Sequence, residues 1–595
     1  MQSVQGIASK LHRLAVACSL SVAGTLNVAC GDSDTATSVA GGATGGIVTN
    51  DGRDAGTPQG DGGGGGSAHD GGSGGTSSGG ASDASRPGTT GGASGTGGSG
   101  TGGGSGYGRW IAYVADEHPV DGGTLHSDLY GVDLTRPGFP RTLLSTDRPD
   151  DAFVLFFRFA PDGSRLAYQA NDPMGLASTL SVVDLRQTTP AAPAPVTVKG
   201  SVTAFEWSPN SKLLAFAARE SGQVTVYYAD TSGSPAAPLV IDADVGDYMV
   251  HFFWITDDVL LYQTYSDSSN AVVKYVKRDT NGFGPPQPLP FSGSSFQLAV
   301  APVRDNPASA AVGSYTAFDP LYVNFVTGQT VEFTSNWDKA SFSADLAYAL
   351  TFEDSAHVSL HPGTDNSPAA KIATYPMRNH ADSAPYSRCV PPLWANHGAT
   401  LAFADENLTL QVVTLSSGAN PVPRAVGGGY SGACKATFSP DDRWLYIANT
   451  SGTRYLARRE TTGYVDAVQI GSAWDAASGA SSASAMVAFA PDSHALVYEE
   501  EPAPSGHSFY LTDLAGQAPS QPRQIDSIAS GSGAVIWSPN SALLGIIHGD
   551  GVMPRQLYVL DANDPSALPK LVLPHAECTT GASDCSRLPL FAFQP

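Results

Sequence analysis

Aromatic side chains are absent from the first 106 residues of the chain. All 53 Trp, Tyr and Phe residues lie at or beyond Tyr107. Large apolar side chains supply most of the area that a folded core buries, so the sequence allows a core only within residues 107–595. Residues 31–106 are mainly Gly, Ser, Thr, Ala and Asp, a composition that does not offset the entropy cost of ordering a chain. We predict that 31–106 is a disordered tether with ends on the order of 50 Å apart.

Basic residues are also scarce. The chain has 32 Lys and Arg against 55 Asp and Glu, a formal net charge of −23. A surface of this sign repels the phosphate backbone of nucleic acids, so we do not expect DNA or RNA as a partner. The simplest interpretation of the acidic surface is solubility.

The sequence after residue 106 contains none of the common catalytic or metal-binding motifs. It lacks G-x-S-x-G, H-E-x-x-H and any long segment of helical periodicity. His357 and His361 have the spacing H-x₃-H, but in an extended segment they would lie about 13 Å apart, too far to share one zinc ion. We therefore interpret both as solvated strand residues, and predict no catalytic residues, metal ion or cofactor.

The N-terminus has the pattern of a targeting segment. Lys10 and Arg13 precede the mostly small or apolar run from Leu14 to Ala29, which is followed by Cys30. A charged start, a short apolar run and small residues before a cleavage point are typical of a secretory signal peptide. The run is shorter than the roughly 20 residues that span a bilayer as a helix.

The end of this segment, Val28-Ala29-Cys30-Gly31, resembles the lipobox of bacterial lipoproteins. The resemblance implies that residues 1–30 are a lipoprotein signal peptide and that Cys30 carries the lipid; ordinary signal cleavage is the alternative. Asn27 departs from the usual Leu at its position. The residue immediately after Cys30 is Gly31 rather than Asp, which in bacterial lipoprotein sorting favours the outer membrane. We expect a protein of the bacterial cell envelope whose lipid anchor is its only membrane contact.

From residue 107 onward, short runs of Val, Tyr, Phe and Leu alternate with clusters of turn-forming residues, which predicts an all-β domain over 107–595. One phrase recurs: an aromatic residue, a tight Pro-Asp or Pro-Asn turn, and an apolar strand. It is clearest from Phe159 to Tyr168. Taking Pro161 as the marker, the counterparts are Pro209, Thr256, Pro302, Ala344, Asn396, Pro440, Pro491 and Pro539.

The spacing of these markers predicts the architecture. Each repeat holds about four strands in 40–50 residues, the size of one β-propeller blade, and radial stacking buries both faces of such a blade. The segment 590–595 reads as the first half of the phrase and 108–113 as the second half. We therefore predict that the C-terminal strand pairs into the first blade and closes a ring. The markers give about ten four-stranded antiparallel blades; alternatively, the degenerate middle is an insertion, or the markers divide between two propellers.

The phrase is similar to the TolB-type, WD-like propeller repeat, F-S-P-D-G followed by an L-A-F or L-A-Y strand. That repeat occurs in periplasmic scaffold proteins, surface lipoproteins and the lids of dipeptidyl-peptidase-like hydrolases. We favour a non-enzymatic, envelope-tethered monomer that binds a protein, peptide or glycan at one mouth of the ring. The alternatives are a propeller lyase or hydrolase with residues gathered from several blades, and a purely structural surface lipoprotein.

Four cysteines follow the tether, which suits an oxidising compartment. Cys578 and Cys585 bracket a polar loop, and we predict a disulfide between them. Cys389 and Cys434 each open the inner strand of consecutive predicted blades, so a second disulfide could join them at the roughly 5.5–6 Å Cα spacing such bonds need. The alternative is two buried free thiols. Neither pair has the spacing of a zinc site.

Charged residues interrupt two consecutive inner strands. Arg158 and Glu206 each stand one residue before the aromatic residue of the phrase. One interpretation is a pair that lines the channel and touches a ligand. The other is an ion pair between neighbouring blades.

Overall fold

The computed structural model describes residues 109–594 with gaps. The gaps are 118–125, 148–151, 173–176, 247–249, 268–269, 294–297, 303–308, 315–320, 334–340, 368–370, 377–391, 416–420, 427–432, 450–452, 472–485, 501–506, 529–531, 550–555, 574–590 and the single positions 188, 199, 234, 244, 355, 366 and 462. The predicted signal peptide and tether lie outside the described residues, as do Cys30, Cys389, Cys578, Cys585 and the side chain of Cys434. Both disulfides therefore stay predictions.

All regular elements in the described ranges are β-strands, and they form sets of four in chain order. The first set is β1 (Trp110–Glu117), β2 (His126–Asp133), β3 (Arg141–Leu143) and β41 (Phe591–Phe593). The second is β4 (Phe153–Phe159), β5 (Arg165–Asn171), β6 (Ser178–Asp184) and β7 (Ala194–Pro195). The third is β8 (Ser201–Trp207), β9 (Leu213–Glu220), β10 (Gln223–Asp230) and β11 (Leu239–Asp242).

The middle of the chain repeats the arrangement. The fourth set is β12 (His251–Thr256), β13 (Val259–Asp267), β14 (Asn270–Asp279) and β16 (Gln287–Gly293), with the short β15 (Gly282–Phe283) beside β14. The fifth is β17 (Leu298–Pro302), β18 (Ser309–Ser314), β19 (Leu321–Asn324) and β20 (Thr330–Glu332). The sixth is β21 (Ser341–Phe342), β22 (Tyr348–Phe352), β23 (His357–Pro362) and β24 (Ala373–Pro376). The seventh is β25 (Leu393–Trp394), β26 (Thr400–Ala404), β27 (Leu410–Thr414) and β28 (Arg424–Ala425).

Three more sets complete the described part. The eighth is β29 (Ala433–Phe438), β30 (Trp444–Asn449), β31 (Arg454–Glu460) and β32 (Gly463–Gly471). The ninth is β33 (Val487–Phe489), β34 (Ala495–Glu500), β35 (His507–Asp513) and β36 (Arg523–Ile528). The tenth is β37 (Ser532–Trp537), β38 (Leu543–Gly549), β39 (Gln556–Asp561) and β40 (Lys570–Leu573). The count of ten predicted from the markers is confirmed for the described residues.

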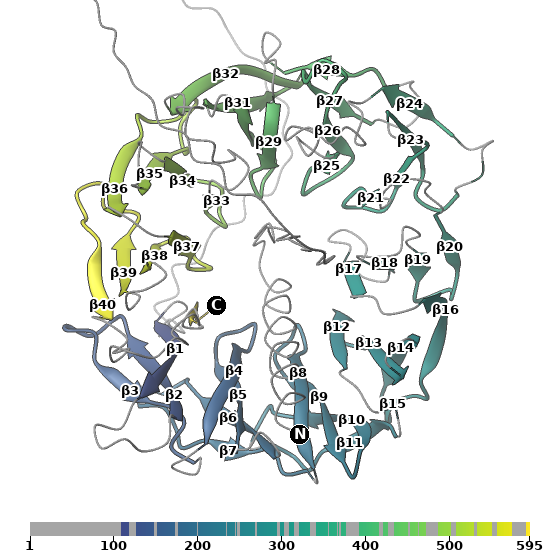
Figure 1. Cartoon of the computed structure of the whole chain (residues 1–595), viewed down its shortest axis with the longest axis vertical. Helices are drawn as coiled ribbons and strands as arrows, with labels where there is room; N and C mark the ends of the chain where they lie inside the picture. The colour runs from purple at the N-terminus through teal and green to yellow at the C-terminus, as the bar shows by residue number, and fades with distance from the viewer. Residues whose placement is uncertain are drawn as a thin grey trace, which may run out of the picture. The chain divides into compact units, whose positions relative to one another are not determined.

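Neighbouring strands within each set are antiparallel, and the sets follow one another around a β-propeller (Figure 1). The strand that precedes each Pro-Asp or Pro-Asn turn is the innermost of its blade, and the fourth strand is the outermost. The first two blades are joined by one parallel bridge between Ser127 and Phe153. No helix in the described part has the length and hydropathy that a membrane span requires.

The predicted pairing of the C-terminal strand with the first blade is present. β41 is antiparallel to β1, with Ile111 opposite Phe593 and Tyr113 opposite Phe591. Sequence-adjacent strands alone do not complete the first blade, because its innermost strand comes from the far end of the chain. The pairing gives the first blade the same four strands as the others.

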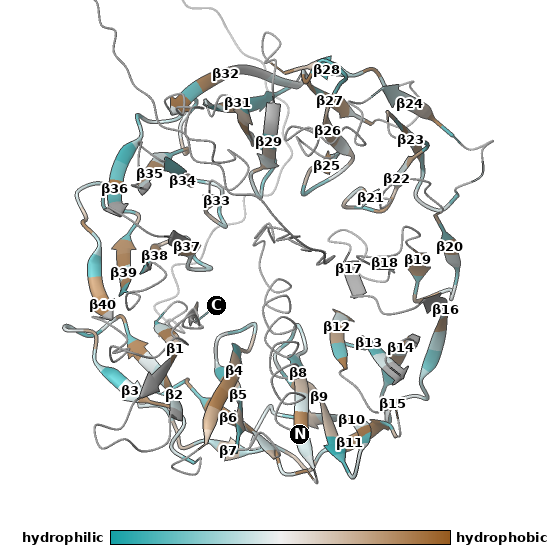
Figure 2. Ribbon diagram, in the orientation of Figure 1, coloured by the Kyte–Doolittle hydropathy of each residue, from teal (hydrophilic) through white to brown (hydrophobic). Residues whose placement is uncertain are grey.

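The hydrophobic core lies between blades rather than within one of them. Each consecutive pair of blades shares a cluster of buried residues, and the tenth shares one with the first through Val559 and Val132. Both faces of each blade are therefore covered, which explains why the strands are apolar on both sides. In Figure 2 the hydrophobic residues of β39 contrast with the hydrophilic residues of the outer strand β36.

This two-sided burial corrects one expectation. His361, in the third strand of its blade, keeps only 7% of its surface exposed, so its interpretation as a solvated histidine was wrong. His357 at the start of the same strand is exposed, as expected. His361 is the penultimate residue of β23, so burial in this strand extends almost to its end.

Candidate functional site

The turns that follow the inner strands share one unusual backbone conformation. The residue after the turn Asp or Asn has a positive φ: 67° at Gly163, 62° at Ser211, 57° at Asp442, 64° at Ser493 and 60° at Ser541. Glycine adopts this region at the lowest cost. Serine or aspartate at the same position indicates that the side chain has a task that glycine does not perform.

That task is to bind the preceding blade. The Ser211 hydroxyl accepts a hydrogen bond from the backbone N–H of Asp162 in the second blade at 2.8 Å. Ser493 accepts the N–H of Asp441 at 3.0 Å, and Ser541 accepts that of Asp492 at 2.9 Å. Adjacent blades are therefore held in register by one polar bond at each of these turns.

The turn acids close their own turns. The Asp162 carboxylate accepts the backbone N–H of Ser164 at 2.9 Å, and the same bond recurs at the ends of the third strands, from Arg186 N–H to Asp184 at 3.0 Å. These are Asx-turns, in which a short polar side chain replaces a backbone acceptor. Strands one and three of a blade run in the same direction, so both kinds of turn lie at one edge. We call this edge, exemplified by 162–164 and 184–186, the turn edge.

Aromatic residues of the phrase add further bonds between blades. The indole N–H of Trp207 donates to the Arg158 carbonyl at 3.2 Å, and that of Trp537 donates to the Ala488 carbonyl at 3.1 Å. The Tyr262 hydroxyl donates to Asp242, in the outer strand of the preceding blade, at 2.8 Å. The aromatic positions are therefore fixed by polar bonds as well as by burial.

Among these contacts, the boundary between the second and third blades differs in charge. Arg158 in β4 and Glu206 in β8 form an ion pair, with 20% and 19% of their side chains exposed. Burial lowers the pKa of Arg158 to about 10, so the guanidinium stays charged at neutral pH. The structure brings the two predicted residues together as a pair across neighbouring inner strands. We call the group Arg158, Asp162, Arg165, Glu206 and Trp207 the β4–β8 junction.

Arg165 is the member of the β4–β8 junction that sequence reasoning missed. It is the first residue of β5, and its register partner on β6 is Asp184. Only 6% of its surface is exposed, and its guanidinium lies 5.8 Å from the ring centre of Trp207. Buried arginines are uncommon unless they are paired, so the position calls for a physical explanation.

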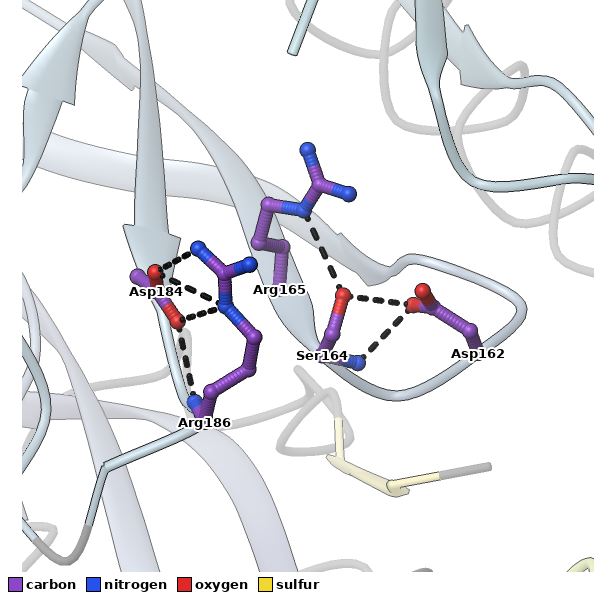
Figure 3. A network of polar contacts seen from close by, with 5 residues as sticks. All are labelled: Asp162, Ser164, Arg165, Asp184 and Arg186. Carbon is purple, nitrogen blue, oxygen red and sulfur yellow. Dashed lines mark hydrogen bonds and ion pairs between the residues drawn. The ribbon is translucent and has the colours of Figure 1, made fainter. Parts of the chain in front are cut away.

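Figure 3 shows how the surrounding polar groups are used. Arg186 binds the Asp184 carboxylate in a bidentate manner, with Nε at 2.9 and 3.0 Å from its two oxygens. The Ser164 hydroxyl donates to Asp162 at 2.7 Å and accepts from Nε of Arg165 at 3.3 Å. The Arg186 hydrogen bond holds the pKa of Asp184 below its usual range. Both carboxylates are therefore engaged by groups of their own turns.

Other clusters of titratable side chains give less support for a binding or catalytic site. The described residues contain no group of three or more His, Cys, Asp or Glu side chains that could hold a metal ion. His548 contacts Asp526 across the boundary of the ninth and tenth blades, and its ring lies 4.7 Å from that of Tyr558. This contact has the same character as the other bonds between blades.

Neither a known family description nor a curated protein matches the sequence. Solved structures resemble it at low identity. They include a crystal structure of a eukaryotic initiation factor (10% identity, 78% of this chain and 95% of that one, TM-score 0.38). The Dos1 propeller shows 12% identity over 59% of this chain and 93% of its own, with a TM-score of 0.31. Hsv2 of Kluyveromyces lactis shows 12% over 53% and 94%, with a TM-score of 0.32. The fold assignment rests on the sheets described above.

A repeat alignment contains the signal that would have found Arg165. The residue that begins the second strand is Leu213 in the third blade, Trp444 in the eighth, Ala495 in the ninth and Leu543 in the tenth. In the seventh blade it is Thr400. A charged residue at a position that is uncharged in these blades marks a local departure.

Proposed function

We propose that the protein is an envelope-tethered, non-enzymatic β-propeller of the TolB type that binds a protein, peptide or glycan partner at the turn edge. The observation that carries the proposal is the β4–β8 junction. It combines an arginine–glutamate ion pair between two inner strands with a buried arginine at the start of a second strand, and holds them on a frame of Asx-turns and bonds between blades. A rigid polar frame reduces the ordering cost of binding.

The carboxylates of this edge favour binding over catalysis. Asp162 and Asp184 each accept hydrogen bonds from their own turns, and the bond from Arg186 holds the pKa of Asp184 below its usual range. A general acid or base needs a pKa near the working pH instead. The described acids of the turn edge thus support recognition of a partner.

The tether and lipid anchor belong to the same proposal. The lipobox-like sequence ending at Cys30 and the Gly- and Ser-rich segment 31–106 support a monomer held at the bacterial envelope, most simply in the outer membrane. Acyl chains stabilise membrane association by about 0.8 kcal/mol per buried CH₂. We expect Cys30→Ser to yield an unlipidated protein in the soluble fraction. Fatty-acid labelling that persists in this variant would exclude Cys30 as the attachment point.

Two charge reversals, one in the turn before β9 and one within β9, test whether the partner binds at the turn edge. Lys212 and Arg219 are both exposed and lie near opposite ends of the same hairpin arm, Lys212 on the turn edge and Arg219 on the other. We expect crosslinking of envelope fractions to lose a specific partner band in Lys212→Glu and to retain it in Arg219→Glu. The reverse pattern would place the partner at the other mouth. Equal retention in both variants would contradict binding at the turn edge.

A further inference from the structure

The guanidinium of Arg165 occupies a place that is uncharged in the equivalent blades. In the second blade Phe159 lies opposite Leu166, as Trp207 lies opposite Leu214 in the third. The residue before that leucine is therefore equivalent in both blades, and it is Arg165 in one and Leu213 in the other. Leu213 is 1% exposed. The neighbouring blade thus packs against an apolar side chain at this position, and a charge there adds a desolvation cost.

The structure gives most of the donors of Arg165 no acceptor. A guanidinium has five N–H donors; here Nε donates to Ser164 Oγ at 3.3 Å, and buried Nη1 has no hydrogen-bond partner among the described residues. In Figure 3 both terminal nitrogens point away from Asp184 and Arg186, and neither is joined to Asp162. A buried charged donor without an acceptor is rare in proteins and marks a site where a bonding group is to be expected.

Neighbouring carboxylates do not supply that group. Asp162, Asp184 and Asp230 lie close enough to act on the charge of Arg165, together with Arg186. Asp162 is bonded to Ser164, Asp184 to Arg186, and Asp230 to Ser232. Each carboxylate is therefore held by its own turn, and the remaining acceptor has to come from outside the blade pair.

We propose that Arg165, on the ring of Trp207 at the turn edge, binds a carboxylate group of the partner. This inference rests on the proposed function and specifies the chemistry of its ligand. A planar carboxylate matches the fork of a guanidinium, and the Trp207 ring beside it is fixed by its bond to the Arg158 carbonyl. The three nearby carboxylates oppose a doubly charged phosphate more strongly than a singly charged carboxylate. The carboxylate comes from an acidic peptide residue or a uronic acid of a glycan.

Acetate is the first probe, with acetamide and inorganic phosphate as comparisons at constant ionic strength. We expect acetate to raise the melting temperature of the full chain and to change its tryptophan emission through Trp207. Acetamide should do neither.

Arg165→Leu, which introduces the residue found at this position in the third blade, should weaken acetate binding at least about tenfold. Its melting temperature without acetate should equal or exceed that of the wild type, because the desolvation cost is removed. Lys212→Gln, on the same edge, is the control and should bind acetate as the wild type does.

Four results would overturn the proposal. The first is an unchanged acetate response in Arg165→Leu, and the second is an equal loss of acetate binding in Lys212→Gln. The third is phosphate binding as tight as acetate binding. The fourth is a loss of folding in both Arg165→Leu and Arg165→Met, which would make the arginine structural. N-acetyl-aspartate amide and glucuronate then distinguish the two sources of the carboxylate. If acetate binding depends on Arg165 but Lys212→Glu does not affect partner crosslinking, the carboxylate site stands and the proposed partner edge is rejected. If Lys212→Glu abolishes the crosslink but acetate binding does not depend on Arg165, the carboxylate site alone is rejected.

Discussion

Gln594 and Trp110 bind one another in both directions. The backbone N–H of Gln594 donates to the Trp110 carbonyl at 2.8 Å, and the side-chain oxygen of Gln594 accepts the N–H of Trp110 at 3.1 Å. The side-chain nitrogen of Gln594 donates to the Gly163 carbonyl of the second blade at 2.6 Å. One amide therefore joins the innermost strand of the first blade to its neighbour strand and to the next blade.

Replacing this amide should loosen the first blade. Gln594 is 6% exposed, so Gln594→Ala leaves buried N–H and C=O groups without partners, at a cost of roughly 1–3 kcal/mol. We expect a lower midpoint of urea unfolding, followed by circular dichroism. The exposed Gln469→Ala in the eighth blade is the control and should leave the midpoint unchanged. An equal midpoint for both variants would show that β41 does not contribute to stability.

The positive-φ serines should tolerate only particular replacements. Ser493→Ala loses the acceptor for the Asp441 N–H and keeps a backbone conformation unfavourable for alanine, so we expect a loss of roughly 1–2 kcal/mol. Ser493→Gly removes the conformational cost and should lose less. Ser493→Asp, which copies Asp442 of the preceding blade, should lose least. Thermal unfolding gives the order of the three variants, and an alanine variant as stable as the glycine variant would contradict the argument.

Asp133 should make stability depend on pH in the acid range. Burial raises the pKa of this carboxyl, but hydrogen bonds from Arg109 and Thr135 outweigh it and hold the pKa below its usual value. A carboxyl whose pKa is lowered in the folded state stabilises that state above its unfolded pKa of about 3.9, and this stability is lost as the pH falls through the folded pKa.

Asp133→Asn tests this dependence. The variant keeps an acceptor for the Thr135 N–H, which Asp133 binds at 3.0 Å, and loses the ion pair with Arg109 at 2.5 Å. We expect lower stability at pH 7 and a smaller fall in melting temperature between pH 7 and pH 3 than in the wild type. Asp561→Asn, in the equivalent turn of the tenth blade, is the control.

The ion pair of the β4–β8 junction should show coupling in a double-mutant cycle. Glu206→Met takes the carboxylate away from a largely buried guanidinium and should cost about 1–3 kcal/mol. Arg158→Met together with Glu206→Met should cost less than the sum of the two single changes, because neither charge of the pair remains. Additive losses would show that the pair does not hold the two blades together and would favour contact with a ligand.

The recurring phrase allowed the fold to be predicted because its information is local. Pro-Asp and Pro-Asn turns set the ends of the inner strands, and the third-strand acids close Asx-turns from two residues away. The same local chemistry made the fifth blade detectable at Pro302, where the phrase is weakest and β17 ends. Nine markers, and a tenth copy divided between 590–595 and 108–113, could therefore be counted without any knowledge of which residues touch.

The candidate site could be predicted only in part. Arg158 and Glu206 stood out because charges interrupt inner strands, and they do form a pair. Arg165 was missed because the Trp207 ring beside it belongs to the next blade, and His361 was taken as solvated although only 7% of its surface is exposed. Contacts between blades are absent from any window of sequence the length of one repeat.

The sequence by itself determined the all-β repeat and its turns, since both depend on side chains within a few residues of the backbone they bind. It indicated about ten blades but left an insertion or two propellers as alternatives. The tertiary structure alone decided which side chains lie between blades, that Gln594 completes the first blade beside Trp110, and that Arg165 is buried without an acceptor at Nη1 among the described residues. Burial and pairing across blades depend on stacking in space, which brings together residues that the chain separates by a whole repeat or more.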